Sequence, residues 1–293
     1  MHQPVTGVIA IDKPAGVSSR RVVDAVAAAL GTKSVGHAGT LDPLATGVVV
    51  VCVGQATKFV DFVHDLPKHY RGTFLLGRSS PSDDLETEAV MEPAPVRPSR
   101  ADLDAALPAF RGAILQRPCD YSAVHVAGKR AYRLARKGRP VEIAAKPVHI
   151  DRLEVTAYDW PRLDLDIVCS SGTFVRAIGR DLAAALGTRA VMESLVRTAV
   201  GPFTKAAAVP LAAVSPEAVR EALLPAAAAV PHLPRFVLDE AALAHAVSGG
   251  LVDLGPDAAE TLVACDEAGD LVGILRRHDS GRHRLRPNFR GAG

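Results

Sequence analysis

Residues 36–47 read Gly36-His37-Ala38-Gly39-Thr40-Leu41-Asp42-Pro43-Leu44-Ala45-Thr46-Gly47, and the apolar run Val48-Val49-Val50-Val51-Cys52-Val53-Gly54 follows directly. Three glycines and one proline interrupt the segment, so its backbone is expected to bend sharply or to approach another segment closely. Asp42 is its only carboxylate and precedes a predicted short strand. Two interpretations are open here. Asp42 can be the N-cap of a helix with Pro43 at its first position, or a reactive group that a loop presents from a rigid scaffold. The two need not exclude each other, because a short helical turn that starts at Asp42-Pro43 could aim the carboxylate.

Composition and charge narrow the class of protein. The chain has 293 residues, of which 48% are hydrophobic and 23% charged, as is typical of a globular protein with a sizeable core. The net charge is only +2, yet Lys129–Arg139 carries six basic and no acidic residues, and Arg276–Arg290 carries six arginines and one aspartate. Each basic segment is either solvated surface or a contact to a polyanion.

Several classes of function lack their sequence signals. The four cysteines are far apart and form no C-x-x-C pair, and the ten histidines show no metal-ligand spacing, so buried thiols and no metal are expected. Phosphate-loop, nucleophile-elbow and dinucleotide-binding motifs are missing from the sequence. No signal peptide and no apolar run of membrane-spanning length is found, so a soluble, cytoplasmic protein is expected.

Strands and helices are expected in runs that do not strictly alternate, which favours an α+β fold. The expected strands cover residues 7–12, 48–53, 68–77, 147–156, 163–170, 193–200, 261–265 and 271–277. The expected helices cover residues 18–30, 99–110, 177–186, 216–223 and 239–247, together with a basic helical segment at 128–138. Pro231-His232-Leu233-Pro234 is the best domain boundary, and the tail beyond it suffices for a small barrel-like module.

Five motifs in order resemble those of bacterial tRNA pseudouridine-55 synthases, the TruB family. They cover roughly residues 7–205. They are Asp12-Lys13-Pro14-Ala15-Gly16-Val17-Ser18-Ser19, the Gly36–Lys58 segment, Lys68-His69-Tyr70-Arg71, Tyr121-Ser122-Ala123 with Gly128-Lys129-Arg130-Ala131-Tyr132, and Cys169-Ser170-Ser171-Gly172-Thr173-Phe174-Val175-Arg176.

The resemblance implies a fold and a reaction. The fold would be a large mixed, mostly antiparallel sheet flanked by helices, with a catalytic domain over residues 1–230 and an RNA-gripping insertion at about 124–147. A PUA-like RNA-binding module would follow at residues 235–293. The reaction would isomerise one uridine of the tRNA T-loop after base flipping, with no cofactor and no metal, because it is redox-neutral. A monomer that binds the T-arm without a guide RNA or a membrane is expected.

The resemblance also assigns roles to three residues. Asp42 would be the nucleophile and would attack either the base or the ribose anomeric carbon. Tyr70 would stack on the flipped uracil and serve the proton transfer at C5, although a buried strand aromatic is the plainer interpretation. Arg176 would pair with Asp42 and favour its ionised form, although a surface salt bridge is the commoner fate of an arginine.

Further residues are expected to contact RNA or to support the site. His37 would contact the flipped nucleotide or occupy the space it vacates, and Lys13 would support the catalytic loop or bind a phosphate, unless they are an ordinary loop histidine and a surface lysine. Phe174 stands where many family members have Tyr, which leaves stacking or packing for that position, and Leu195 would pack beside the site. The phosphate-gripping residues would be Lys129, Arg130, Arg133, Arg136 and Lys137.

Two alternatives to a stand-alone synthase stay open. One is a related synthase that needs a guide RNA and protein partners, although the compact tail and the basic insertion fit the stand-alone type better. The other is a tRNA-folding chaperone or RNA-binding protein whose main role is not catalysis.

Overall fold

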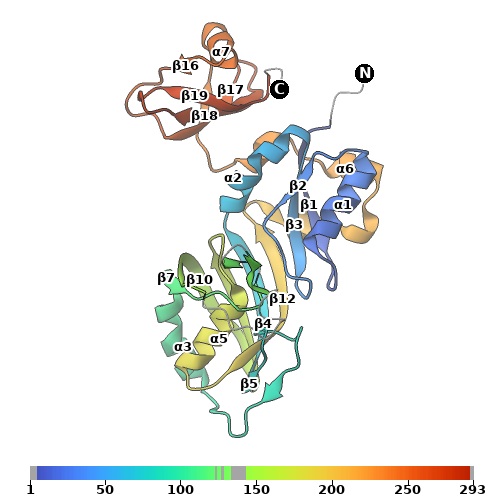
Figure 1. Ribbon diagram of the computed structural model, residues 1–293, viewed down its shortest axis with the longest axis vertical. Helices are drawn as coiled ribbons and strands as arrows, with labels where there is room; N and C mark the ends of the chain where they lie inside the picture. Colours follow the sequence, from blue (N-terminus) through green and yellow to red (C-terminus); the bar gives the residue numbers. More distant parts are fainter. Residues whose placement is uncertain (1–4, 123, 127–128, 133–142, 291–293) are drawn as a thin grey trace.

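The computed structural model describes residues 5–122, 124–126, 129–132 and 143–290, and every structural statement below refers to these. Their largest feature is a mixed sheet with the order β14-β1-β3-β12-β4-β11-β10-β7, in which β2 also pairs with β3 and β13 with β12 (Figure 1). The strands of this sheet are β1 (Gly7–Lys13), β2 (Val35–Ala38), β3 (Thr46–Val53), β4 (Lys68–Leu76), β7 (Gly112–Gln116), β10 (Lys146–Asp159), β11 (Arg162–Cys169), β12 (Ala190–Val200), β13 (Phe203–Thr204) and β14 (Val209–Pro210).

The pairing confirms the expected mixed, mostly antiparallel sheet. β3 and β12 are parallel, as are β1 and β14, whereas β1–β3, β12–β4, β4–β11, β11–β10 and β10–β7 are antiparallel. The β3–β12 contact is unusually close. Gly47 lies opposite Arg197, and a Cβ at Gly47 would lie 2.2 Å from the Arg197 carbonyl oxygen, so only glycine fits there.

β3 shows why its sequence is continuously apolar instead of alternating. Every residue from Val48 to Val53 is fully buried. Because successive side chains of a strand point to opposite faces, Val49, Val51 and Val53 pack in one apolar cluster and Val48, Val50 and Cys52 in another. A strand that is covered on both faces needs no polar side.

Helices cover the sheet. They include α1 (Ser19–Leu30), which begins after the predicted N-cap Ser18 and ends at Gly31 (φ 62°), α2 (Val60–Asp65), α3 (Arg100–Ala106), α5 (Val175–Ala185) and α6 (Pro216–Ala222). In α1, Val22, Val23 and Val26 form the buried face that their spacing predicts. None of the described helices combines the length and the apolar character needed to cross a membrane.

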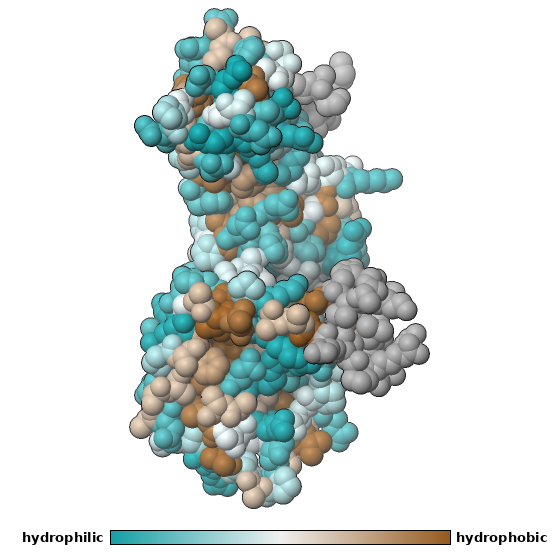
Figure 2. Space-filling model, turned by 60° about the vertical axis from the view of Figure 1, so that its left-hand side comes forward, coloured by the Kyte–Doolittle hydropathy of each residue, from teal (hydrophilic) through white to brown (hydrophobic). Residues whose placement is uncertain are grey.

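The tail forms a second, smaller sheet with its own core. Its order is β15-β17-β18-β19-β16. These strands are β15 (Arg235–Val237), β16 (Leu251–Val252), β17 (Thr261–Cys265), β18 (Leu271–Arg277) and β19 (His283–Asn288), and α7 (Glu240–Val247) packs beside them. Figures 1 and 2 show this sheet as a lobe at one end of the molecule. The domain boundary at residues 231–234 and the RNA-binding role of the tail stay predictions.

Aromatic and cationic contacts attach the tail to the segment that follows β3. The rings of Phe59 and Phe289 lie 4.8 Å apart between centroids, and the Arg276 guanidinium lies 5.2 Å from the centroid of the Phe62 ring. Lys58 also donates a hydrogen bond of 3.4 Å to the carbonyl of Asn288. The tail therefore packs against α2 and the 3-10 helix Gly54–Phe59, which follow the 36–47 segment closely in the sequence.

Two local expectations are wrong or incomplete. Within the expected helix 128–138, Lys129–Arg130 form strand β9, which pairs with β8 (His125–Val126). Ala131 and Tyr132 are helical, as expected, and residues 128 and 133–138 lie outside the described residues. The sequence also predicts an extended segment at 116–126, of which only Gln116 and β8 are in strands, and residues 120–122 form bends. All four cysteines are buried, as expected.

Candidate active site

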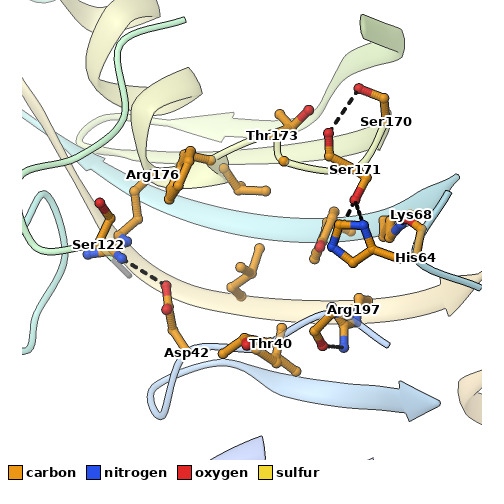
Figure 3. A pocket seen from close by; sticks show the side chains of 17 residues that line it. Thr40, Asp42, His64, Lys68, Ser122, Ser170, Ser171, Thr173, Arg176 and Arg197 are labelled. Atoms are coloured by element: carbon orange, nitrogen blue, oxygen red, sulfur yellow. Dashed lines mark hydrogen bonds and ion pairs between the residues drawn. The ribbon is translucent and has the colours of Figure 1, made fainter. Parts of the chain in front are cut away.

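A cavity of about 250 Å³ lies where four segments meet, namely the loop before β3, strand β4, strand β12 and the turn from β11 into α5 (Figure 3). Asp42, Tyr70, Phe174, Arg176 and Leu195 all line it. These predicted residues are up to 153 positions apart in the chain, from Asp42 to Leu195, and the sheet order brings them to one place.

Asp42 reaches the cavity from a single turn and not from a helix. The N–H of Ala45 donates to the carbonyl of Asp42 at 3.1 Å, and β3 begins one residue later, at Thr46. No helix begins at Asp42 in the described segment, so Asp42 is not the N-cap of a helix, and only the single turn closed by Ala45 is present. The reason is that β3, which pairs with β1 and β12, begins at Thr46 and leaves too few residues for a second turn. The Asp42 side chain is 39% exposed and therefore accessible to a substrate.

Arg176 joins two carboxylates. It stands in the first turn of α5 and its side chain is only 5% exposed. Its guanidinium lies 3.0 Å from Asp42 Oδ2 on one side and 3.1 Å from Asp84 Oδ2 on the other, and it donates to the carbonyls of Ser82 and Tyr121 at 2.9 and 3.0 Å. Although burial opposes the charged form, the Asp42 carboxylate leads the neighbours that raise the pKa of Arg176. The cation is thus permanent and rigidly held.

Asp84 is a site residue that the sequence did not single out. Its side chain is fully buried, accepts from the Ser82 hydroxyl at 2.5 Å and from the Glu86 N–H at 3.0 Å, and holds the far side of Arg176. In the sequence it belongs to a polar, acidic loop without periodicity, where nothing separates it from its neighbour Asp83. Only the packing of this loop against α5 makes it a positioning residue.

Replacing Asp84 by asparagine is expected to lower kcat about 10- to 100-fold, because Arg176 would lose one of the two charges that orient it toward Asp42. The measurement is single-turnover kinetics with saturating RNA. Asp83→Asn is the matched control, since Asp83 pairs with Arg180 at 3.2 Å and asparagine tolerates its positive φ of 59°. A loss shared equally by both variants would remove the positioning role from Asp84.

Tyr70 lies at the base of the cavity, opposite Arg197 in the β4–β12 pairing. Burial raises the pKa of Tyr70, although the positive charge of the nearby Arg197 opposes the shift. The same guanidinium donates to the carbonyls of Val48 at 2.6 Å and Gly39 at 3.1 Å. Arg197 is 1% exposed and links the loop before β3, β3 itself and the neighbourhood of Tyr70. Its strand also contains Glu193, Ser194 and Thr198, so the sequence alone does not single it out.

Lys13 and His37 lie behind the cavity and do not line it. Lys13 is fully buried and donates to the carbonyls of Pro14, Val17 and Pro43 at 2.9, 2.7 and 3.3 Å, so it holds the loop that carries Asp42 at its neighbour Pro43. Burial lowers its pKa to about 8, against the opposing effect of Asp42. His37 is in β2, and its Nδ1 is buried without a hydrogen-bond partner among the described residues.

Replacing Lys13 by methionine is expected to lower the free energy of unfolding by about 2–4 kcal/mol, because three carbonyls would lose their donor in the protein interior. Chemical denaturation measures this change. Lys33→Met is the matched control, since Lys33 is exposed on the surface and its change should stay within about 0.5 kcal/mol. Equal small losses in both variants would contradict a structural role for Lys13.

The remaining predicted residues fall into two groups. The backbone of Phe174 is fixed by the Gln116 side chain, which accepts from its N–H at 2.8 Å and donates to its carbonyl at 3.1 Å. Leu195 is buried beside it in the cavity wall. Lys129 and Arg130 are placed only by their backbone in β9, whereas Arg133, Arg136 and Lys137 lie outside the described residues.

Comparisons with known proteins find similar sequences over most of the chain. Residues 28–175 match the family described as TruB family pseudouridylate synthase (N terminal domain). The chain is 38% identical over 296 residues to tRNA pseudouridine synthase B of Gluconacetobacter diazotrophicus, which covers 94% of this chain and 95% of that protein. It is 49% identical over 208 residues to the protein of the same name from Dinoroseobacter shibae, covering 71% of this chain and 68% of that protein.

Solved structures show the same fold at lower identity. A chain in the crystal structure of a Cbf5-Nop10-Gar1 complex superposes with a TM-score of 0.75 at 22% identity, over 97% of this chain and 85% of that chain. A chain of the archaeal box H/ACA sRNP Nop10-Cbf5 complex gives a TM-score of 0.72 at 21% identity, over 97% and 86% of the two chains. The likeness extends over the main sheet and the tail together.

Proposed function

The chain belongs to the TruB family of pseudouridylate synthases, and from this premise we propose that it converts the T-loop uridine at tRNA position 55 into pseudouridine, with Asp42 as the nucleophile. The observation that carries the proposal is the 3.0 Å ion pair between Asp42 and the buried Arg176, inside a cavity that Tyr70 also lines. The names of the relatives aligned over nearly the whole chain support tRNA as the substrate.

The chemistry needs one nucleophile and one proton transfer. The bond between ribose C1′ and base N1 breaks, the uracil turns, and a bond between C1′ and C5 forms; N1 gains a proton and C5 loses one. Asp42 adds either to C1′ or to the base, and the bond that it forms breaks again before the product leaves. In both routes the carboxylate must be ionised and within reach of the carbon that it attacks. Arg176 meets the first requirement because its charge faces the carboxylate at 3.0 Å.

In this proposal Tyr70 contacts the uracil ring, and Arg197 lies opposite Tyr70 in the β4–β12 pairing. Because burial raises the pKa of Tyr70, its phenol is protonated at neutral pH. A neutral hydroxyl accepts and donates at once, so it can relay the proton that leaves C5, while the ring offers a face for stacking. A uridine inside a folded T-loop must leave its stack to reach this buried floor, which makes base flipping part of the mechanism.

The remaining parts of the proposal concern RNA binding. We assign the basic insertion at about 124–147 to phosphate contacts that position the RNA, and the tail at 235–293 to a PUA-like auxiliary contact. The enzyme would act as a monomer, without a guide RNA, in the cytoplasm where its tRNA substrate is found. A chaperone-only function is less well supported, because it would not need the Asp42–Arg176–Asp84 ion pairs at the cavity.

The test is incubation of the wild-type protein with an unmodified T-stem-loop RNA, followed by base-specific chemical detection of pseudouridine. One pseudouridine at the target uridine is expected, and none in a control RNA with cytidine at that position. Tight RNA binding without product would instead favour the chaperone alternative.

A further inference from the structure

The cavity has two chemically different ends. Figure 3 shows Asp42 and Arg176 facing each other on one side and His64, Lys68 and Ser171 on the other. The first side holds the groups that the proposed reaction uses. The second side holds cations and hydroxyls that neither the proton transfer nor the nucleophilic attack requires.

A hydrogen bond joins the side chains of His64 and Ser171 at this second end. His64 stands at the C-terminal end of α2, and its Nδ1 lies 2.7 Å from the hydroxyl oxygen of Ser171, which belongs to the turn from β11 into α5. His64 also stands close to the catalytic loop, because its ring is 4.0 Å from the position that a Cβ on Gly39 would take. The two side chains are separated by 107 residues in the sequence, and both line the cavity.

The neighbouring cations, Lys68 and Arg197, make the electrostatic potential positive, but most of their hydrogen-bond donors already bind backbone carbonyls. Lys68 is 3% exposed and donates to the carbonyls of His64 and Leu66, and Arg197 is 1% exposed and donates to the carbonyls of Val48 and Gly39. By contrast, His64 is exposed, and its bond to Ser171 can be exchanged for a bond to a ligand. Such a combination suits an anion whose oxygens accept from a hydroxyl and an imidazole.

We propose that His64 and Ser171 form a subsite for one backbone phosphate of the RNA next to the flipped nucleotide. This inference rests on the proposed function, since a base that enters the cavity carries its flanking phosphates to the rim. The Ser171 hydroxyl and the His64 ring would release each other and donate to one phosphodiester. The pair then positions the sugar of the target nucleotide against Asp42 at the opposite end.

The charges around His64 set how this subsite depends on pH. In the free protein the part of the His64 ring that faces the protein is desolvated, which lowers its pKa, and Lys68 and Arg197 act in the same direction, whereas Asp65 and Asp61 on α2 oppose the shift. A bound phosphate stabilises the imidazolium, so the complex holds more protons than the free protein. RNA affinity is therefore expected to rise as pH falls from about 7 to 6, a window in which Lys68, with a pKa of about 8, stays charged.

The experiment combines protein variants with modified RNA. T-stem-loop RNAs carry a neutral methylphosphonate at one or the other phosphate that flanks the target uridine, and affinity is measured for the wild type and for the double variant His64→Gln/Ser171→Ala. One of the two methylphosphonates is expected to weaken wild-type binding about tenfold. The double variant should bind unmodified RNA about tenfold more weakly, lose no further affinity with that methylphosphonate, and show a flat pH response.

Controls separate this inference from folding and from the proposed function. His232→Gln, at an exposed turn, should bind like the wild type, and Ser171→Ala alone, which removes only a hydroxyl, repeats the test if the double variant folds poorly. Full additivity of the protein and RNA changes, or wild-type affinity of the double variant, would overturn the subsite. Absence of pseudouridine with the wild type would instead contradict the proposed function.

Discussion

Replacing Asp42 by asparagine is expected to lower kcat about 10⁴-fold or more, which corresponds to at least about 5.5 kcal/mol of transition-state stabilisation. Asparagine keeps the shape of the side chain, and its oxygen can still accept from Arg176, but an amide is a very poor nucleophile. Binding of the T-stem-loop RNA should change little. Single-turnover kinetics at saturating RNA measure the first quantity, and filter binding measures the second.

The control for this prediction is Asp24→Asn. Asp24 lies on α1 and forms an exposed ion pair with Arg20 at 2.8 Å, so its neutralisation should leave kcat unchanged. If Asp42→Asn weakened RNA binding by the same factor as turnover, Asp42 would be mainly a structural residue of the loop.

Replacing Arg176 by methionine is expected to lower both stability and activity. The free energy of unfolding should fall by about 3–5 kcal/mol, because the fully buried Asp84 would be left without its counter-charge. Turnover should fall about 10²- to 10³-fold, because Asp42 would lose the cation at 3.0 Å that orients it. Arg176→Lys should lie between these values, since an ammonium keeps the charge but cannot reach two carboxylates and two carbonyls in one planar geometry.

A double variant separates the two effects. Asp84→Asn combined with Arg176→Met removes the orphaned buried charge, so it should be more stable than Arg176→Met alone yet equally inactive. Arg180→Met is the matched control on α5. Arg180 pairs with Asp83 and Asp181 outside the cavity lining and should affect stability with little change in kcat. A stable Arg176→Met variant, or recovered activity in the double variant, would contradict this account of the ion pairs.

Much of the fold follows from local pattern. The strands at residues 48–53, 261–265 and 271–277 and the helix that begins after Ser18 agree with the structure, because apolar runs, alternation and capping residues act over short distances. At Asp42 the same local rules left open whether a helix starts there, and the structure has only a single turn. Pairing of β3 with two neighbouring strands, which no local window contains, limits that segment to one turn.

The residues of the site also fall into those that the sequence predicted and those that only the structure revealed. The sequence by itself determined the family and pointed to Asp42, Tyr70 and Arg176, because five motifs in the order found in the family are very unlikely to occur together by chance. Only the tertiary structure decided that Asp84 holds the far side of Arg176, that Arg197 joins Tyr70 to the catalytic loop, and that His64 meets Ser171. Periodicity reports whether a side chain is buried, but the partner of a buried charge comes from a distant segment and is chosen by long-range packing.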